Sequence, residues 1–468
     1  MIEDLKPYPQ YKDSGLPWLG QVPAHWEIAR SKRLFRQRKE FANPEDQQLS
    51  ATQAYGVISQ ALYEKRTGYR VVKISMHLDK RKHVEAGDFV ISMRSFQGGL
   101  ERAWEAGAIR SSYVVLKPSA EVSAGYFQHL FKSNQYINAL RATSDFIRDG
   151  QDLNFGNFCG VALPLIPLQE QTAIARFLAW ATNRLDRAIR AKRRIIALLN
   201  EQKQAIIHRA VTRGLDPSVP LKDSGIPWLG EIPEHWEVHR AKHLFREIDE
   251  RSTLGSEEML SVSHMTGVTP RSQKSITMFK AASYAGHKLC QPGDLVVNTM
   301  WAWMGALGTS SYSGIISPAY AVYRPRQMAG ICSSYIDCLL RSAPYIANII
   351  CQSTGLHTSR LRLYPEAFFR LPINLPPHQE QLLIVDSLKA DTAGLNSTIF
   401  RLESEINLLR EYRTCLIADV VTGKLDVREV AAGLPEEELQ DQPDVAAGYD
   451  ADKAEDDADS DLIDTVED

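Results

Sequence analysis

The sequence has few cysteines and no pattern that would pair them. The six, at positions 159, 290, 332, 338, 351 and 415, form no CxxC pair and have no histidine at zinc-finger spacing. Such cysteines are typical of reduced, mostly buried thiols in a cytosolic protein. The chain also lacks an apolar run of 18 residues and a basic N-terminal segment followed by an apolar one. We therefore expect no membrane-spanning helix, no signal peptide and a cytoplasmic location.

Motifs of nucleotide-binding, methyl-transferring and zinc-hydrolase sites are absent too. The sequence contains no GxxxxGK[ST], no GxGxxG after a strand, no Asn-Pro-Pro-aromatic tetrapeptide and no HExxH. His25 and His235 occupy equivalent positions, but neither has partner ligands nearby, so we expect a structural role for both. The sequence thus predicts no catalytic residue, no metal ligand and no cofactor bound by this chain. An enzyme with an unrecognised site stays an alternative.

The main feature that is present is a long internal repeat. Residues 12–27, KDSGLPWLGQVPAHWE, return as KDSGIPWLGEIPEHWE at 222–237, with twelve of sixteen positions identical and an offset of 210. The tripeptide QEQ at 169–171 returns at 379–381 with the same offset. A period this long indicates duplicated domains, since solenoid repeats have 20 to 50 residues. The chain therefore reads as two copies of one unit and a tail.

The net charge of −3 conceals a basic body and an acidic end. Residues 431–468 hold fifteen Asp or Glu and one basic residue, Lys453, and so carry −14, which leaves +11 for residues 1–430. With a single aromatic residue, Tyr449, the end is expected to be a disordered tail over 429–468. It is either a solubilising extension or a DNA mimic that competes for the basic body.

Each copy has the same order of strand and helix signals. A Gly-Asp turn leads into an apolar strand at 87–92 and at 293–298, and a second strand ends at a proline at 113–118 and at 320–325. Amphipathic helices are expected near 126–142 and 335–351. The segment 168–212 then contains no Pro and no Gly, which predicts one helix of about 65 Å.

Leucines repeat at intervals of seven in this helix and in its counterpart. The first series is Leu178, Leu185, Leu199 and Ile206, with Lys192 in the missing place, and the second is Leu388, Leu395, Leu402, Leu409 and Leu416. Two such stripes in one chain predict an antiparallel, coiled-coil-like pair, although simple packing of domains is an alternative. Gly214 and Gly423 are expected to end the two helices.

The ordered set of motifs resembles the DNA-specificity subunit of type I restriction-modification systems. The matching pieces are DSGxPWLGxxPxHWE, the Gly-Asp strand, the helix entries LPLIPLQEQ (163–171) and LPINLPPHQEQ (371–381), and the VTxGxLD-like exits. They cover about residues 5 to 428 in both copies. The stretch 298–305, NTMWAWMG, also looks like one class of target-recognition domain. Such subunits are prokaryotic and cytoplasmic.

The resemblance implies an α+β fold in which two target-recognition domains are separated by two long antiparallel helices. The implied segments are 1–21 (repeat), 22–166 (recognition domain 1), 167–215 (helix 1), 216–231 (linker), 232–376 (recognition domain 2), 377–428 (helix 2) and the tail 429–468. Each domain would read one half of a split, asymmetric site in double-stranded DNA, and the helices would set the spacer. Two modification subunits using S-adenosylmethionine, and two restriction subunits using ATP and Mg, would join a chain that does no chemistry itself.

Residues that could read DNA lie in three segments of each copy, chosen because Arg, Lys, Asn and Gln are the usual base readers. An ordinary solvated loop, or packing in the case of the tryptophans, is the alternative for each. The candidates are Arg70 and Lys73 (69–73), Arg94 and Gln97 (93–99), Arg148 and Gln151 (144–151), Trp301 and Trp303 (300–305), Lys274 and Lys280 (272–280) for contact with the DNA backbone, and His357, Ser359, Arg360 and Arg362 (355–362) for contact with phosphates or bases.

A second set of residues is expected to form the scaffold or to contact partner subunits. It comprises Trp18, Trp26, Trp228, Trp236, Leu178, Leu185, Leu199, Leu388, Leu395 and Leu409. The outer helix faces, with Trp180 and the Arg and Lys residues of 184–194, are expected to accept the modification subunits. The remaining alternative is a stand-alone DNA-binding regulator with the same fold, which would bind its site without partners.

Overall fold

The computed structural model describes residues 5–71, 80–92, 95–143, 153–264, 266–273, 283–326, 330–355 and 361–435. The chain divides into two compact units. Unit 1 comprises residues 1–193 and 403–468, and unit 2 comprises residues 194–402. Among the described helices, none combines the length and the apolar composition needed to cross a membrane.

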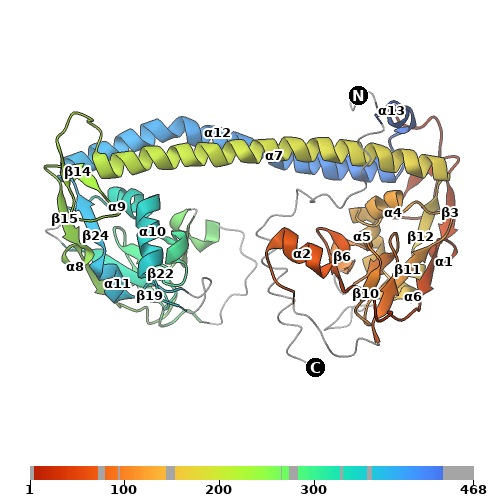
Figure 1. Ribbon diagram of the computed structural model, residues 1–468, viewed down its shortest axis with the longest axis horizontal. Coiled ribbons are helices and arrows are strands. Elements are labelled where there is room, and N and C mark those ends of the chain that lie inside the picture. Colours follow the sequence, from red (N-terminus) through yellow and green to blue (C-terminus); the bar gives the residue numbers. More distant parts are fainter. Residues whose placement is uncertain are drawn as a thin grey trace. The chain divides into compact units, whose positions relative to one another are not determined.

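Unit 1 begins with the following elements (Figure 1): β1 (Tyr11–Asp13), β2 (Gln21–Pro23), β3 (Glu27–Arg30), α1 (Ser31–Leu34), β4 (Phe35–Arg38), β5 (Leu49–Thr52), β6 (Gly56–Ser59), α2 (Gln60–Thr67), β7 (Lys82–Val84), β8 (Phe89–Ile91), α3 (Ser95–Gly98), β9 (Glu101–Arg102), β10 (Gly107–Ile109), β11 (Val114–Pro118), α4 (Ala124–Leu130), α5 (Asn134–Arg141), α6 (Phe155–Cys159) and β12 (Ala162–Leu165). Its main sheet has the order β4-β11-β8-β9, with antiparallel neighbours. Strands β3 and β12 pair with each other and close the domain.

Unit 2 repeats this order: β13 (Leu221–Asp223), β14 (Glu231–Pro233), β15 (Glu237–Arg240), α8 (Ala241–Leu244), β16 (Phe245–Ile248), β17 (Leu260–Ser263), β18 (Gly267–Pro270), η2 (Arg271–Gln273), β19 (Lys288–Cys290), β20 (Leu295–Val297), η3 (Ala302–Met304), β21 (Leu307–Thr309), β22 (Gly314–Ile316), β23 (Ala321–Pro325), α9 (Ser333–Leu340), α10 (Ala343–Gln352), α11 (Pro365–Arg370) and β24 (Pro372–Leu375). The sheet order β16-β23-β20-β21 matches that of unit 1. The predicted strands after the Gly-Asp turns and before the prolines are confirmed as β8, β20, β11 and β23.

The helices expected near 126–142 and 335–351 are confirmed, and each range holds two of them, α4 and α5 in unit 1 and α9 and α10 in unit 2. In unit 1, α4 ends at Leu130, and the extended residue Ser133 caps α5, accepting a hydrogen bond from the Tyr136 backbone N–H. In unit 2, Pro344 stands in the first turn of α10. A proline there has no N–H to continue α9, so it favours a new helix start.

The long helix predicted at 168–212 is confirmed as α7 (Leu168–Arg213), and the second long helix is α12 (His378–Val421). Both end near a glycine of positive φ, Gly214 at 73° and Gly423 at 80°, a conformation that favours glycine. In unit 1, Asp186 of α7 pairs with Arg413 of α12 at 2.8 Å, and Lys192 pairs with Glu405. A later residue of α7 thus pairs with an earlier residue of α12, so the two helices run antiparallel within unit 1.

Lys192 therefore interrupts the leucine stripe because it forms an ion pair with the other helix. Leu178, Leu185 and Leu388 are buried, while three further stripe positions are half-buried: Leu199, Leu395 and Leu409. In unit 2, Lys203 Nζ donates to Asn396 Oδ1 at 2.7 Å, so α7 and α12 also meet there.

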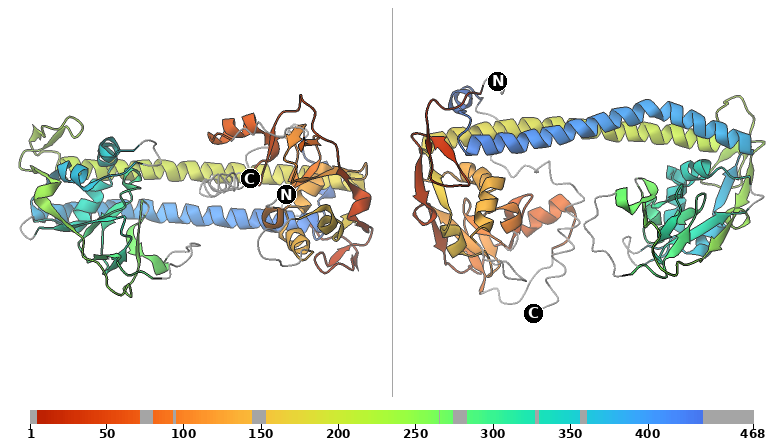
Figure 2. Two further views of the ribbon diagram at one scale, coloured as in Figure 1. Left: turned by 90° about the horizontal axis from the view of Figure 1, so that it is seen from below. Right: turned by 180° about the vertical axis from the view of Figure 1, so that it is seen from behind.

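The predicted tail begins too early, because residues 428–432 form a short helix, α13 (Arg428–Ala432). Val427, Ala431 and Leu434 are buried in the core of unit 1, and the spacing of these apolar residues lets one helical face pack. The Asp426 backbone N–H donates to Lys6 O at 2.8 Å, so α13 lies beside the first described residues of the chain (Figure 2). Residues 436–468 lie outside the described part.

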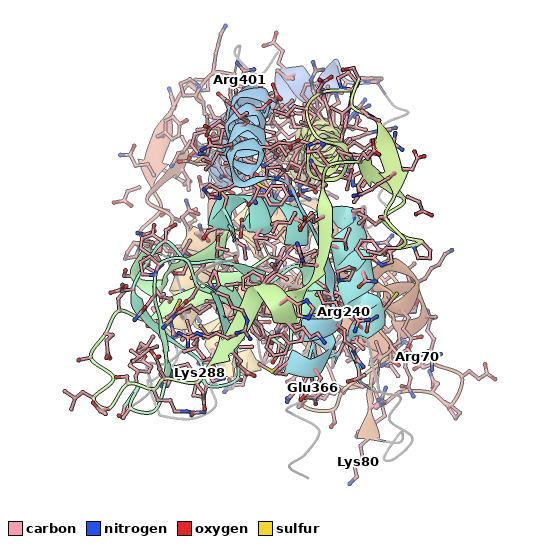
Figure 3. The ribbon with its side chains drawn as sticks, turned by 90° about the vertical axis from the view of Figure 1, so that its left-hand side faces the viewer. Arg70, Lys80, Arg240, Lys288, Glu366 and Arg401 are labelled. Atoms are coloured by element: carbon pink, nitrogen blue, oxygen red, sulfur yellow. The ribbon has the colours of Figure 1, made fainter. Side chains whose placement is uncertain are left out.

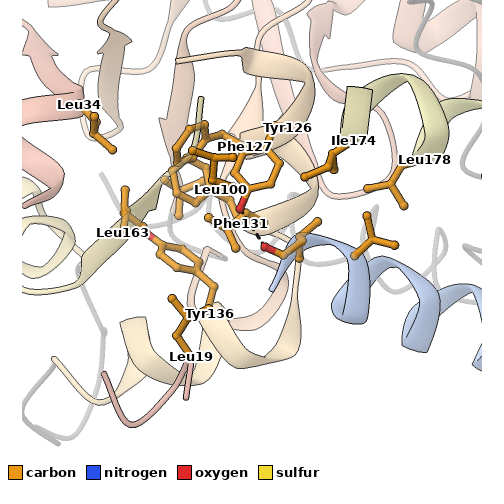
Figure 4. Close-up of a cluster of buried hydrophobic side chains, with 14 of the residues drawn as sticks. Leu19, Leu34, Leu100, Tyr126, Phe127, Phe131, Tyr136, Leu163, Ile174 and Leu178 are labelled. Atoms are coloured by element: carbon orange, nitrogen blue, oxygen red, sulfur yellow. Dashed lines mark hydrogen bonds between the residues drawn. The ribbon is translucent and has the colours of Figure 1, made fainter. Parts of the chain in front are cut away.

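The core of unit 1 is aromatic and is shared by the sheet and the long helices. The Phe35 ring lies 5.2 Å from Phe127 and 5.4 Å from Phe131, between their centroids. Ile174 and Leu178 of α7 complete the cluster on the side of Tyr126 (Figure 4). The mixed α/β domain of unit 1 therefore shares this core with α7, which supplies part of it.

Candidate nucleic-acid interface

A single buried carboxylate fastens the N-terminal repeat segment of unit 1 to the start of α7. Glu170, with a side chain 5% exposed, accepts hydrogen bonds from Tyr8 Oη at 2.7 Å and from Trp26 Nε1 at 2.9 Å. His25 Nε2 lies 2.7 Å from its other oxygen. Burial, followed by the hydrogen bond to Glu170, raises the pKa of Tyr8, so the phenol stays a donor.

Unit 2 has the same anchor with fewer partners. Trp236 Nε1 donates to Glu380 Oε1 at 3.0 Å, and His235 Nε2 lies 2.7 Å from Glu380 Oε2. The Glu380 side chain is 24% exposed. In each unit the His and Trp of the HWE motif thus contact the glutamate of the QEQ motif.

The glutamine after each anchoring glutamate binds the loop that leads into the short helices of the same unit, α4 in unit 1 and α9 in unit 2. Gln171 accepts from the Ser123 backbone N–H and donates to the carbonyls of Glu121 and Ile166, all at 2.7 to 2.8 Å. Gln381 makes the corresponding contacts with Cys332, Gly330 and Pro376. These buried amides fix the domain relative to the helix start within each unit.

The end of the other long helix is held as well. Tyr126 Oη donates to the carbonyl of Val421, near the end of α12, at 2.8 Å. In unit 2, Tyr335 Oη and Asn374 Nδ2 donate to Val211 O, near the end of α7. Carbonyls of a last helical turn lack partners within the helix, so each domain satisfies them. Each unit is thus built on the start of one long helix and the end of the other.

The four predicted scaffold tryptophans lie at these anchors. Trp26 and Trp236 are fully buried. Trp18 packs edge-on against Tyr136 with centroids 5.9 Å apart, and Trp228 packs in the same way against Tyr345 at 5.0 Å. Whether any of them also contacts a partner subunit stays a prediction.

The Gly-Asp turn braces the main sheet in both units. Gly87 has φ 92° and Gly293 has φ 90°. The buried Asp88 pairs with Arg38 of β4 at 2.7 Å, whereas Asp294 pairs with Arg324 of β23 at 2.8 Å. The acid is conserved between the copies, but its arginine comes from a different strand. The turn therefore has a structural role in both units, and the residues that follow it can differ between the two copies.

The candidate DNA-reading residues of unit 1 that the structure describes are Arg70 and Gln97, and both are exposed. Gln97 lies on α3, and its neighbour Gly98 lies so close to Gln53 that an added Cβ would stand 2.5 Å from it. At Gly99 an added Cβ would stand 2.0 Å from the Phe131 carbonyl oxygen. The space beside these two glycines is therefore filled by Gln53 and by the Phe131 carbonyl. Lys73, Arg94, Arg148 and Gln151 lie outside the described residues.

In unit 2 the structure brings two candidate segments together. Trp301, 46% exposed, stacks on Trp303 with centroids 6.2 Å apart and an angle of 16°. Leu363, next to the exposed Arg362, donates its backbone N–H to Thr299 O at 2.9 Å. The backbones next to these two candidate segments thus meet. Lys274, Lys280, His357, Ser359 and Arg360 lie outside the described residues.

One sequence expectation about the helices is corrected. Trp180 was expected on an outer face that accepts partners, but it is only 8% exposed and belongs to the core of unit 1. Its ring lies 6.0 Å from Phe177, and Arg184 lies over it at 5.8 Å. The predicted outer face at this position is therefore covered.

Sequence reasoning missed one group of cations. Lys80, Arg81 and Lys82 are consecutive, and Arg110 lies opposite Arg81 at the end of the β7–β10 pair. The run of three basic residues was a visible signal, but the approach of Arg110 depends on strand pairing. Within the described part of the chain, no three His, Cys, Asp or Glu residues gather into a possible metal site.

Comparison with known proteins gives consistent relatives. No family model matches the chain. It is 34% identical over 87 residues to the type I restriction enzyme MjaVIII specificity subunit of Methanocaldococcus jannaschii, covering 19% of each chain. It is 27% identical over 126 residues to the putative type I restriction enzyme MjaX specificity subunit of the same organism, covering 27% of this chain and 28% of that one. The matches thus span about a fifth and just over a quarter of these relatives.

The fold also has a counterpart among solved structures. A chain from a study of complex assembly and conformational transition of the type I restriction-modification system superimposes with a TM-score of 0.55, covering 86% of this chain and 99% of that chain at 16% identity. At this identity the likeness concerns the fold. Taken with the named relatives, it shows that the chain is a homologue of type I restriction enzyme specificity subunits.

Proposed function

We propose that this chain is the DNA-specificity subunit of a type I restriction-modification complex. The mixed α/β domain of each unit reads one half of a split, asymmetric site in double-stranded DNA. The helices α7 and α12 form an antiparallel, coiled-coil-like spacer that sets the distance between the half-sites. They also bind two modification subunits, and two restriction subunits complete the assembly.

One observation carries this proposal: the same anchor occurs twice, and different exposed residues accompany it. Glu170 and Glu380 hold equivalent tryptophans, whereas the loop after the Gly-Asp strand is α3 in unit 1 and the tryptophan-bearing η3 in unit 2. Two domains with the same scaffold and different loops are suited to bind two different DNA sequences. The site that they read together is then not a palindrome.

The chemistry is assigned to the partners. On this proposal the chain itself binds no cofactor, the modification subunits use S-adenosylmethionine to methylate adenine, and the restriction subunits use ATP and Mg. The basic charge of residues 1–430, +11, supports contact with DNA phosphates. Phosphate contacts position a protein, and base contacts give it specificity.

Single-molecule sequencing of genomic DNA tests the proposal. The DNA is taken from cells that make this chain together with the modification subunit of its own system. The expected result is a split, non-palindromic motif with N6-methyladenine in both strands. Unmethylated DNA in the presence of a soluble co-purifying complex would contradict the proposed role, and site binding by the chain alone would favour a regulator.

A further inference from the structure

Basic residues from two strands gather at one end of the β7–β10 pair in unit 1. Ile109 pairs with Lys82 in the antiparallel register, so the next residues outward, Arg110 and Arg81, face each other. Lys80 precedes them and is exposed, and its side chain points away from the ribbon (Figure 3). We call Lys80, Arg81 and Arg110 the cationic corner. Like charges directly opposite on neighbouring strands are destabilising.

Arg81 is the unusual member because it is buried and, in the described part of the chain, has no acidic partner. It is 6% exposed, and its pKa is lowered, first by burial and then by the charge of Arg110. Within the described residues, no acidic side chain pairs with it.

The acids near this strand have other partners. Asp46 and Glu85 both contact His83, at 2.7 and 3.1 Å, and Glu40 pairs with Arg38 at 2.8 Å. Lys82 Nζ donates to the Tyr113 carbonyl. Among the residues that the structure describes, no acidic side chain therefore compensates the charge of this corner.

A buried arginine without an anion costs stability unless a ligand supplies the negative charge. Arginine is suited to bidentate contact with phosphate oxygens. Ser111 and Ser112, which follow Arg110, are exposed and add hydroxyl donors at the same edge. The chemistry that fits this corner is a phosphodiester group.

We propose that the cationic corner binds a backbone phosphate of the DNA duplex and so positions the unit 1 domain on its half-site. The inference rests on the proposed function and adds residues to it. Unit 2 does not repeat the corner: the equivalent positions hold His287 and Ser317, and Lys288 lies 3.5 Å from Asp249. The contact would therefore belong to one half-site only.

The test measures DNA affinity against salt for the complex of the full chain with its modification subunits. Wild type is compared with R110Q, R81Q and the double variant, on a duplex with the methylated motif and on one with that motif scrambled. R33Q is the matched control, because Arg33 is an exposed cation of the same unit that already pairs with Glu121 at 2.8 Å. R110Q keeps the test sound if R81Q does not fold.

Each substitution should lower the slope of log K against log salt by about 1, on both duplexes alike, because a phosphate contact carries no sequence information. R33Q should leave the slope unchanged. Without DNA, R110Q should unfold at the same temperature as wild type or at a higher one, because a like-charge pair has been removed.

Two failures are distinguishable. If wild type binds neither duplex, the proposed function fails. If wild type binds with a clear salt dependence and R110Q has the same slope, the cationic corner does not contact phosphate. A lower unfolding temperature for R110Q together with unchanged DNA affinity would make the pair structural, which also overturns the inference.

Discussion

Removing the anchoring carboxylate of each unit should destabilise unit 1 more than unit 2. In E170A, Tyr8 Oη and Trp26 Nε1 both lose their acceptor inside the protein. His25 is partly exposed and can turn to water. In E380A, only Trp236 Nε1 is left as a buried donor without an acceptor.

The magnitudes follow from the number of buried donors. Leaving one buried donor unsatisfied costs about 1–3 kcal/mol. E170A, with two, should destabilise unit 1 by about 2–6 kcal/mol, and E380A, with one, should destabilise unit 2 by about 1–3 kcal/mol. E170Q retains a carbonyl acceptor and should fall between wild type and E170A.

Hydrogen exchange read by peptides separates the two units. Peptides of β3 and β12 should exchange at least about 30-fold faster in E170A, since 1.4 kcal/mol corresponds to a factor of ten. Peptides of β15 and β24 should respond to E380A instead. E201A, at an exposed position of α7, is the control for the loss of a helical glutamate. Unchanged exchange in E170A, or equal effects of both variants on both units, would refute the reasoning.

Three further predictions follow. Inserting seven residues into both α7 and α12, about 10 Å of helix, should lengthen the unread spacer in the methylated motif and leave both half-sites intact; altered half-sites would contradict the spacer role. W301A should change the base preference of one half-site in a randomised-site methylation assay, and loss of both would argue for a folding defect. Burial raises the pKa of Tyr126 and Tyr335 well above 10, so the stability they contribute is present below about pH 10 and is lost as pH rises beyond it. Their tyrosinate absorbance should therefore appear only with unfolding, and ionisation near pH 10 in the folded protein would disprove this.

The elements that the sequence predicted well are those marked by strong local signals. The helix α7 follows Pro167 and ends before Gly214 with neither residue type between, and β8 and β20 follow a Gly-Asp turn. The break between α4 and α5 depends on a single serine cap, Ser133, which is a weak local signal. The break between α9 and α10 has a stronger local signal, Pro344 in the first turn of α10.

The candidate site was less predictable because its contacts join distant residues. HWE and QEQ were both visible as repeats, but Trp26 and Glu170 are 144 residues apart, and only the fold joins them. Trp180 was misplaced for the same reason: it shares a buried cluster with Ala431 and Leu434, in a segment assigned to a tail. The opposition of Arg81 and Arg110 likewise depends on strand register.

The most direct test of the account is an exchange of the unit 1 recognition domain. Residues 22–166 are replaced with the corresponding domain of a related specificity subunit, and methylated motifs are sequenced for both proteins. The account predicts that one half of the split motif changes while the other half and the spacer stay the same. A change in both halves, or in neither, would contradict the claim that each domain reads its own half-site.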